Sequence, residues 1–256
     1  MLQLCYDGTW EGFLTAVFEV YAAKLDSVYV SADPPGLFDS REIITDETKA
    51  KRVAAGLEKQ GGELLETLYS AFLSCLPVEN NILALIRRAF SGANPIDAKV
   101  QGPRLDREPG AETVDYADED LRQVLFASRQ TGMEINRFMG FVRFVHVGGD
   151  MYIADIAPGP DILERLGHHF HERFNIQRFI IRDTNRRKML CSDNDGWWIV
   201  KLAPGEDMPP LPKEGIIEDM WRRYFKTIDN PARRNPKLQQ HFVPKKYRQN
   251  LTEFRQ

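Results

Sequence analysis

The sequence has few cysteines and no long apolar run. Its 256 residues include three cysteines, none of them in a CxxC pair. So sparse a set excludes a disulfide-stapled secreted domain and a chain that ligates an iron–sulfur cluster by itself. No apolar stretch approaches the ~20 residues needed to cross a bilayer, and the N-terminus lacks a signal-peptide pattern. We therefore expect a cytoplasmic protein with no cofactor of its own and no membrane partner.

The motifs of several large enzyme families are also missing. There is no P-loop, GxGxxG, GxSxG or HExxH pattern, which argues against an NTPase, a Rossmann dehydrogenase, an α/β-hydrolase and a zinc protease. The HHFHE cluster at 168–172 is the obvious metal candidate. However, adjacent histidines on a helix point about 100° apart, and the spacing fits no zinc-finger pattern. We predict no metal site.

Charge is distributed unevenly along the chain. The formal net charge is −3, from 34 basic and 37 acidic residues. Residues 221–256 hold ten basic and two acidic side chains, a net charge of +8, so residues 1–220 carry −11. A basic end on an acidic body is typical of a protein with one polyanion-binding face. The same run also fits a solvated segment or one that pairs with the acidic body.

The N-terminal part, 1–91, is predicted to be mainly helical. Apolar residues recur there at helical spacing, Asp46 is a typical N-cap, and Gly61-Gly62 is a typical helix break. Short strands are expected at 2–6 and 41–45. The proline- and glycine-rich stretch that follows, 92–113, predicts an exposed connection.

The next part, 114–228, is predicted to mix helices with strands. A helix from about Asp118 toward Met139 precedes a β-hairpin around Gly148-Gly149 and a second helix at 161–174. Three further strands with short polar turns, at 178–183, 188–193 and 197–202, suggest an antiparallel meander. We expect one α+β unit over 1–256, with helical N- and C-terminal parts around a mainly antiparallel sheet.

Near the C-terminus, large apolar residues form a helical stripe: Ile217, Met220, Trp221, Tyr224, Phe225 and Ile228. We expect this stripe to be buried against the sheet, with Arg222, Arg223 and Lys226 facing outward. The basic C-terminal segment, 229–256, follows it.

Several charged residues are candidates for a functional site. Asp7 and Glu11 stand at the start of the first predicted helix, where carboxylates suit acid–base chemistry but more often cap backbone amides. Arg137 and Arg143 bracket a helix-to-strand junction. Their guanidinium groups suit either an anion clamp or ion pairs with Glu134.

Four segments occur in a fixed order along the chain. They are YDGTWEGFLTAVFEVY (6–21), EINRFMGFVRF (134–144), HHFHERF (168–174) and WRRYFKTI…RRNPKLQ…VPKKYRQNLTEF (221–254). Together they resemble a family of bacterial proteins described as DNA-metabolism or DNA-repair proteins. Each motif alone is weak, but the ordered set spans nearly the whole chain.

The resemblance implies a role in DNA metabolism or repair. Members of that family look like companions of a radical-SAM DNA-modification or repair protein, and some carry a fused uracil-DNA-glycosylase-like domain. The sequence ends at Gln256, soon after VPKKY, so we expect no such domain here. Scattered cysteines fit a chain that needs a separate radical-SAM partner. The family usually has an aromatic residue where Arg248 stands, which weakens any base-stacking role at that position.

The motif matches single out individual positions: Asp7, Gly8, Glu11, Arg137, Gly140, Arg143, His169, Arg173, Trp221, Arg233, Asn235, Gln239, Lys245 and Tyr247. The candidate acid–base residues are Asp7, Glu11 and His169. The candidate nucleic-acid or phosphate-binding residues are Arg137, Arg143, Arg173, Arg222, Arg233, Lys245 and Lys246.

Three classes of function remain open from the sequence. The first is a DNA-metabolism factor that binds nucleic acid and works with a radical-SAM partner. The second is a self-contained hydrolase or glycosylase-like enzyme acting on nucleic acid. The third is a protein–protein adaptor that does not bind nucleic acid. A concave pocket that gathers Asp7, Glu11 and His169 with Arg143 would favour the enzyme, whereas their use as caps and surface pairs would count against it.

Overall fold

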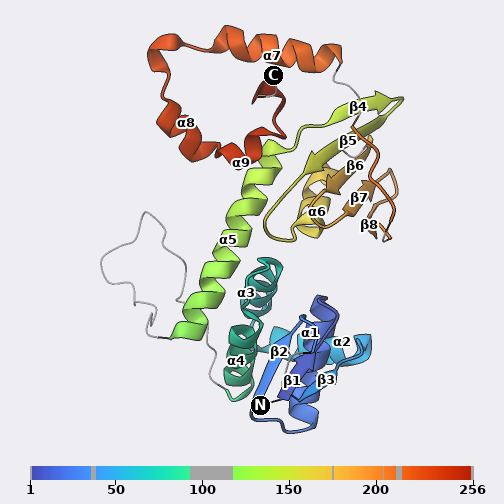
Figure 1. The fold of residues 1–256 in the computed structure, drawn as a ribbon, viewed down its shortest axis with the longest axis vertical. Helices are drawn as coiled ribbons and strands as arrows, with labels where there is room; N and C mark the ends of the chain where they lie inside the picture. Colours follow the sequence, from blue (N-terminus) through green and yellow to red (C-terminus); the bar gives the residue numbers. More distant parts are fainter. Residues whose placement is uncertain are drawn as a thin grey trace. The chain divides into compact units, whose positions relative to one another are not determined.

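The computed structural model describes residues 2–35, 39–92, 118–174, 176–203, 205–211 and 215–254 (Figure 1). The chain divides into two compact units, Met1–Gly132 and Met133–Gln256. Each unit has its own cluster of buried apolar residues. Most of the predicted connection at 92–113 lies outside the described residues.

The first unit contains a three-stranded parallel sheet. Its strand order is β2 (Val28–Ser31), β1 (Leu2–Cys5), β3 (Ser40–Glu42). Helix α1 (Trp10–Ala22) connects β1 to β2, because parallel neighbours need a crossover. The predicted strand at 2–6 is confirmed, and β3 is an edge strand that overlaps the one predicted at 41–45. The sequence pattern does not predict β2, whose four residues are too few to show alternation.

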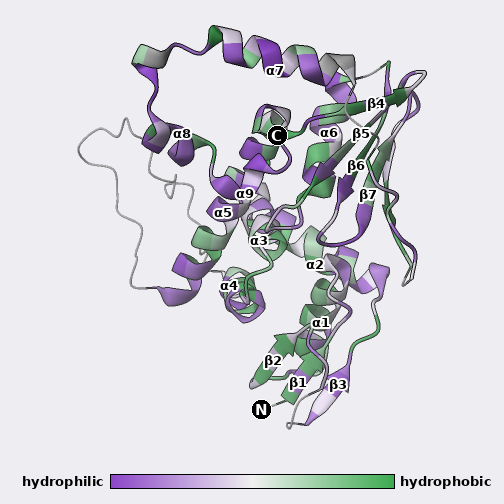
Figure 2. Ribbon diagram, turned by 45° about the horizontal axis from the view of Figure 1, so that its top comes forward, coloured by the Kyte–Doolittle hydropathy of each residue, from purple (hydrophilic) through white to green (hydrophobic). Residues whose placement is uncertain are grey.

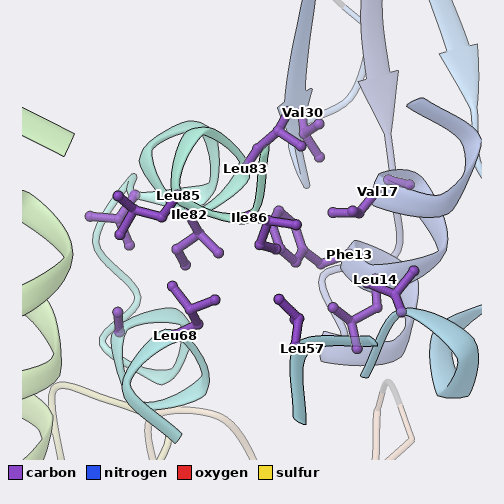
Figure 3. Packing of buried hydrophobic residues seen from close by; sticks show 14 of the residues in the cluster. Phe13, Leu14, Val17, Val30, Leu57, Leu68, Ile82, Leu83, Leu85 and Ile86 are labelled. Atoms are coloured by element: carbon purple, nitrogen blue, oxygen red, sulfur yellow. The ribbon is translucent and has the colours of Figure 1, made fainter. Parts of the chain in front are cut away.

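Three more helices complete this unit: α2 (Glu47–Gln60), α3 (Gly62–Leu73) and α4 (Glu79–Phe90). Asp46 is the N-cap of α2, as predicted, and its side chain accepts hydrogen bonds from two backbone N–H groups. Figure 3 shows how these elements share one core. The side chains that converge there are fully buried and come from four helices and one strand: Phe13, Leu57, Leu68, Ile86 and Val30.

Helix α5 (Glu119–Phe141) crosses the boundary between the units and continues through Gly132 without a break. Charged residues recur along its 23 residues. Across the described ranges, no helix combines the length and the hydrophobicity that a bilayer span requires.

The second unit contains a five-stranded sheet in the order β4-β5-β6-β7-β8. Its strands are Val145–Gly148, Met151–Ile156, Arg178–Asp183, Lys188–Ser192 and Trp197–Lys201. All neighbours are antiparallel except β5 and β6, which α6 (Leu163–Arg173) connects. The predicted hairpin, meander and α+β class are therefore confirmed, and this sheet is mainly antiparallel as expected.

Helix α6 packs on one face of the second sheet. Its apolar side chains and those of the strands form the core of this unit: Leu163, Leu166, Phe170, Phe179, Ile181 and Leu190. Trp197 of β8 packs against this core, whereas Trp198 is 48% exposed. Successive strand residues point to opposite faces, so only one of the two tryptophans can face inward, and Trp197 is that residue.

The C-terminal segment forms an arc that returns to α5 (Figure 1). It consists of α7 (Ile216–Ile228), η1 (Pro231–Arg233), α8 (Pro236–Phe242), α9 (Lys245–Arg248) and η2 (Thr252–Phe254). Tyr247 of α9 is 3% exposed, and its ring contacts Phe138 and Phe141 of α5. Tyr247 therefore anchors this part of the arc to α5.

The expected burial of the α7 stripe is wrong. Met220, Tyr224 and Ile228 are 64%, 55% and 57% exposed, and Trp221 is 40% exposed. Phe225 contacts Phe254 of η2, with ring centroids 6.1 Å apart. The side chain of Ile217 lies outside the described residues. Helical spacing shows that a face is apolar, but it does not show that another element covers it; Figure 2 shows hydrophilic and hydrophobic residues mixed along α7.

Close packing between α6 and β8 requires a glycine at position 167. A Cβ there would lie 2.8 Å from Trp197 and 2.9 Å from Leu190, whereas one on Gly140 of α5 would meet nothing within 4 Å. We expect Gly167→Ala to lower the free energy of unfolding by about 1–3 kcal/mol through overpacking. Gly140→Ala, the control, should raise it by up to about 1 kcal/mol. Urea unfolding followed by circular dichroism measures both, and equal stability of the two variants would contradict this packing.

Candidate functional site

The candidate carboxylate Asp7 holds the turn between β1 and α1. One of its oxygens accepts hydrogen bonds from the backbone N–H of Thr9 at 3.0 Å and from the Thr9 hydroxyl at 2.6 Å. The other accepts from the Thr45 hydroxyl at 2.8 Å. Burial raises the pKa of Asp7, but these hydrogen bonds outweigh it, and the net pKa is below the usual value. A carboxylate so stabilised in its ionised form is a weak general base.

The conformation of this turn also explains why the motif has glycine at positions 8 and 12. Gly8 has a φ of +78°, in the left-handed region that favours glycine. A Cβ on Gly12 would overlap the Asp7 carboxylate and lie 2.9 Å from the Thr45 hydroxyl. Thr9 is the N-cap of α1 and accepts from the Gly12 N–H. The conformation of this turn thus accounts for Asp7, Gly8, Thr9 and Gly12 of the motif without a catalytic role.

Glu11 lies in a different setting, beside a groove between α1 and α2. The groove has a volume of about 310 Å³ and is lined by Trp10, Glu11, Leu14, Glu47, Ala50, Lys51 and Ala54. Glu47 and Lys51 form an ion pair across one turn at 2.9 Å. Asp7 is not among the lining residues, so the two candidate carboxylates do not face one pocket.

His169 lies on α6 in the second unit. Its Nε2 is buried and has no hydrogen-bond partner among the described residues, and its ring meets Phe170 edge-on at 5.0 Å. A buried nitrogen without donor or acceptor is poorly placed for proton transfer. The neighbouring histidines point elsewhere: His168 contacts Trp197, and His171 Nδ1 lies 2.9 Å from Ser192 Oγ. In the part of the chain that the structure describes, no group of three or more ligating side chains is placed to hold a metal ion.

A buried carboxylate, Glu134, joins α5 to the C-terminal segment. Glu134 is 4% exposed and accepts a hydrogen bond from the Tyr247 hydroxyl, 113 residues away. Lys246 Nζ donates to Glu134 at 3.2 Å. Arg137 lies 3.6 Å from Glu134 and donates to the Tyr247 hydroxyl at 3.2 Å. The motifs EINRFMGFVRF and VPKKY therefore meet in a single cluster.

Electrostatics of this cluster favour a structural joint. Burial raises the pKa of Tyr247, and the hydrogen bond to Glu134 raises it further, so the phenol stays protonated and donates. Burial lowers the pKa of Lys246, but hydrogen bonds to Tyr247 and Glu134 outweigh burial and raise it overall. Two cations and a hydroxyl thus compensate one buried negative charge.

Arg143 forms a second joint at the end of α5. Its guanidinium binds Glu253 through two N–H groups, at 2.8 and 3.3 Å, and donates to the Gly140 carbonyl at 2.7 Å. Trp221 of α7 donates its indole N–H to the same carboxylate at 3.2 Å. Burial raises the pKa of Glu253, but the hydrogen bonds from Arg143, the backbone and Trp221 outweigh it and lower the pKa overall. Glu253 thereby ties α5 and α7 to η2.

These contacts divide the predicted phosphate-binding residues into two groups. Arg137, Arg143 and Lys246 bind buried carboxylates, and Arg222 pairs with Asp219 on α7 at 2.6 Å. The remaining three are exposed: Arg173, Arg233 and Lys245. The Arg173 guanidinium lies 5.9 Å from the centre of the Phe174 ring.

The C-terminal segment also presents exposed cations without an ion pair among the described residues: Arg223, Lys226, Arg233, Lys237 and Lys245. Large apolar side chains are exposed on the same helices: Met220, Trp221, Tyr224, Ile228, Leu238 and Phe242. We call these eleven residues the basic–aromatic surface. Exposed cations and exposed rings therefore occur together on the C-terminal segment.

The carboxyl ends of the parallel strands β5 and β6, where α/β proteins often bind ligands, are closed by internal bonds. Arg186 and Asn185 donate to the Pro158 carbonyl at 3.2 and 3.0 Å. Asp183, fully buried, accepts from Arg186 at 3.0 Å. The polar groups at this edge of the sheet are therefore hydrogen-bonded to one another and to the adjoining loops.

Sequence reasoning missed Glu253 and the true partner of Arg143, which pairs with Glu253 and not with Glu134. A signal was present: Asp229 and Glu253 are the two acidic residues within the basic segment 221–256. An isolated acidic side chain among cations is a natural partner for an arginine elsewhere in the chain, as Glu253 is for the half-buried Arg143. Asp229 likewise pairs with Arg234.

The Arg143–Glu253 pair gives a pH-dependent prediction. The pKa of Glu253 is lowered on folding, so its ionised form stabilises the fold above the ordinary glutamate pKa. That stability is lost as the pH falls through the lowered value. We expect Glu253→Gln to destabilise the protein by about 1–3 kcal/mol at neutral pH, and much less near pH 3.

Urea unfolding between about pH 3 and pH 7 measures this difference. Glu63→Gln, which changes an exposed carboxylate on α3, is the matched control and should differ little from the wild type at every pH. A Glu253→Gln deficit that stays constant over this range would contradict the assignment.

A family model matches most of the second half of the chain. It is a domain of unknown function, DUF4130, and the match covers residues 105–253. The matched span includes Glu134, Tyr247 and Glu253, the residues of both joints. No curated protein and no solved structure matches the chain. Because the matched residues make up more than half of the sequence, the chain belongs to the DUF4130 family.

Proposed function

We propose that this protein is a DNA-metabolism or DNA-repair factor that binds single-stranded nucleic acid through the basic–aromatic surface and acts together with a radical-SAM partner in the cytoplasm. The basic–aromatic surface is the observation that carries the proposal. Exposed cations contact phosphates, and exposed rings stack on unpaired bases, which is how proteins bind single strands without sequence preference.

The charge distribution supports one binding face. Residues 1–220 carry a net charge of −11, which repels a polyanion, while the C-terminal segment carries an excess of cations. Three of these cations are paired internally: Lys246 with Glu134, Arg222 with Asp219 and Arg234 with Asp229. The five cations of the basic–aromatic surface, which have no ion pair within the described ranges, remain to contact phosphates. Five such contacts would give a slope of log affinity against log salt of about −3.5 for a single strand.

The positions of the three acid–base candidates give less support to a self-contained hydrolase than to a binding protein. Asp7 serves the β1–α1 turn, Glu11 lines a separate groove, and His169 Nε2 is buried. Each therefore has a local setting that does not involve the other two. The geometry favours a binding function over an enzyme built on these residues.

An adaptor is the second candidate, and the exposed stripe on α7 favours it. Met220, Tyr224 and Ile228 follow one another at a spacing of four residues and lie on one helix face. An exposed apolar face of this kind often binds another protein. The two candidates differ in their dependence on salt and on strandedness.

Removing three unpaired cations tests nucleic-acid binding. We expect the triple variant Arg233→Gln, Lys237→Gln, Lys245→Gln to bind single strands more weakly and to reduce the salt slope by about 2 units. Lys246 is left unchanged because its removal would take away one of the two cations that compensate the buried Glu134 carboxylate. Fluorescence anisotropy of labelled single- and double-stranded oligonucleotides at several salt concentrations measures the slope.

A control triple variant changes the same net charge in the first unit: Lys24→Gln, Lys59→Gln and Arg129→Gln. It should keep the wild-type slope. Tyr224→Leu should weaken binding to single strands more than to duplexes, because it removes a ring and keeps an apolar side chain. No binding at low salt, or equal effects of the two triple variants, would overturn the proposal and favour the adaptor.

The radical-SAM partner must bring its own iron–sulfur cluster. Burial raises the pKa of the Cys5 and Cys191 thiols, which disfavours the thiolate that binds iron. We expect the purified chain, incubated with S-adenosylmethionine and a strong reductant, to form no 5′-deoxyadenosine, as measured by chromatography. A known radical-SAM enzyme serves as the positive control. Cleavage by the chain alone would show that the companion role is wrong.

A further inference from the structure

We propose that the second unit contains a pocket for one unstacked nucleobase, between the end of α6 and the beginning of β5 and β6. The cavity has a volume of about 230 Å³ and is lined by Phe144, Tyr152, Phe174, Gln177 and Phe179. Phe179 is 1% exposed and forms the buried floor, while the other four side chains are half-buried. The cavity is thus closed at its base and open at its mouth.

The side chains that line the pocket come from two strands, from one turn and from the residue before β4. Tyr152 and Phe179 are register partners on the parallel strands β5 and β6. Phe174 and Gln177 lie in the turn between α6 and β6, where the Gln177 N–H donates to the Phe174 carbonyl at 3.0 Å. Phe144 directly precedes β4. The walls therefore belong to a sheet and a turn that is closed by a hydrogen bond.

The aromatic rings suit a flat ligand. Phe144, Phe174 and Phe179 contact one another edge-to-face, with interplanar angles of 67° to 77° and centroids 5.3–6.1 Å apart. A planar ring stacked on any one of them stands nearly perpendicular to the other two. It then gains both stacked and edge-to-face contacts, the two favourable geometries for aromatic pairs.

The polar groups of the pocket distinguish a base from an apolar side chain. The Gln177 amide and the Tyr152 hydroxyl have no hydrogen-bond partner among the described residues. A phenyl or aliphatic group would leave both unpaired. A nucleobase carries ring nitrogens and exocyclic groups on its edge, and an amide can both donate to and accept from them.

A cation stands beside the pocket. The exposed Arg173 guanidinium lies 5.9 Å from the ring centre of Phe174, which lines the cavity. Arg173 makes no ion pair within the ranges that the structure describes, so it is available to a phosphate attached to the bound nucleoside. The last residues of HHFHERF, Arg173 and Phe174, thereby acquire a joint role.

This inference goes beyond the proposed function, because it uses none of the residues of the basic–aromatic surface. The test uses free deoxynucleosides, which carry a base but no phosphate: deoxyadenosine, deoxyguanosine, deoxycytidine, thymidine and deoxyuridine. Saturation-transfer NMR detects their contact with the protein. In the ¹⁵N-labelled chain, the side-chain amide signal of Gln177 should shift during the titration.

Two variants remove, in turn, the amide and one of the rings of the pocket and leave an aliphatic side chain in its place. We expect Gln177→Leu and Phe174→Leu each to weaken nucleoside binding at least about tenfold, because one loses the edge contacts and the other a stacking ring. Matched controls are Gln130→Leu and Phe126→Leu on α5 in the first unit, where both side chains are exposed. These should bind like the wild type, and circular dichroism checks that all four variants fold.

The outcomes separate this pocket from the proposed function. The triple variant Arg233→Gln, Lys237→Gln, Lys245→Gln should bind nucleosides as the wild type does, even though it loses affinity for single strands. No saturation transfer to any nucleoside, or binding unaffected by both pocket variants, would overturn the inference. Preferential binding of N-acetylphenylalaninamide would overturn it too, and would identify the pocket as a site for a protein side chain.

Discussion

The contact between Glu134 and Tyr247 is the interaction on which the second unit depends. It closes a loop of 113 residues that contains the whole five-stranded sheet, α6 and the C-terminal arc. Closing so long a loop costs conformational entropy, which a single hydrogen bond does not offset. The neighbouring cations of Arg137 and Lys246 and the apolar contacts of the Tyr247 ring with Phe138 and Phe141 supply the rest. The joint is thus electrostatic at its centre and hydrophobic around it.

The same joint takes one cation of the basic segment, Lys246, into an internal ion pair. A charge count over 221–256 treats all ten basic residues alike, although Lys246 is bound to a buried carboxylate and Arg234 pairs with Asp229. Arg143, outside the segment, removes Glu253 from the surface in the same way. What remains is a smaller set of unpaired cations next to exposed rings. These cations and rings, and not the net charge of the segment, are what the surface offers to a binding partner.

The sequence predicted those parts of the fold that local patterns determine. Asp46 as an N-cap, the hairpin at Gly148-Gly149 and the meander of β6 to β8 all follow from turn chemistry and alternation within a few residues. Whether the α7 stripe is covered is decided by elements elsewhere in the chain, and there the prediction was wrong. The parallel pairing of β1 with β2 likewise depends on how α1 returns the chain, which periodicity does not encode. For the site, the motifs pointed to Glu134, Arg137 and Tyr247 without showing that they touch.

The motif residues of this protein differ in how many of their hydrogen-bonding groups are used within the fold. Asp7, Gly8 and Gly12 complete a turn and leave nothing over for a ligand. Glu134 and Glu253 likewise spend their hydrogen-bonding capacity within the fold. Arg173 differs, because its guanidinium lies over the face of the Phe174 ring and makes no ion pair in the part of the chain that the structure describes. A guanidinium retains its planar set of donors in such a contact. Arg173 is exposed beside the cavity that Phe174 lines, so of these motif residues it is the one whose donors remain available to the base-bearing ligand proposed above.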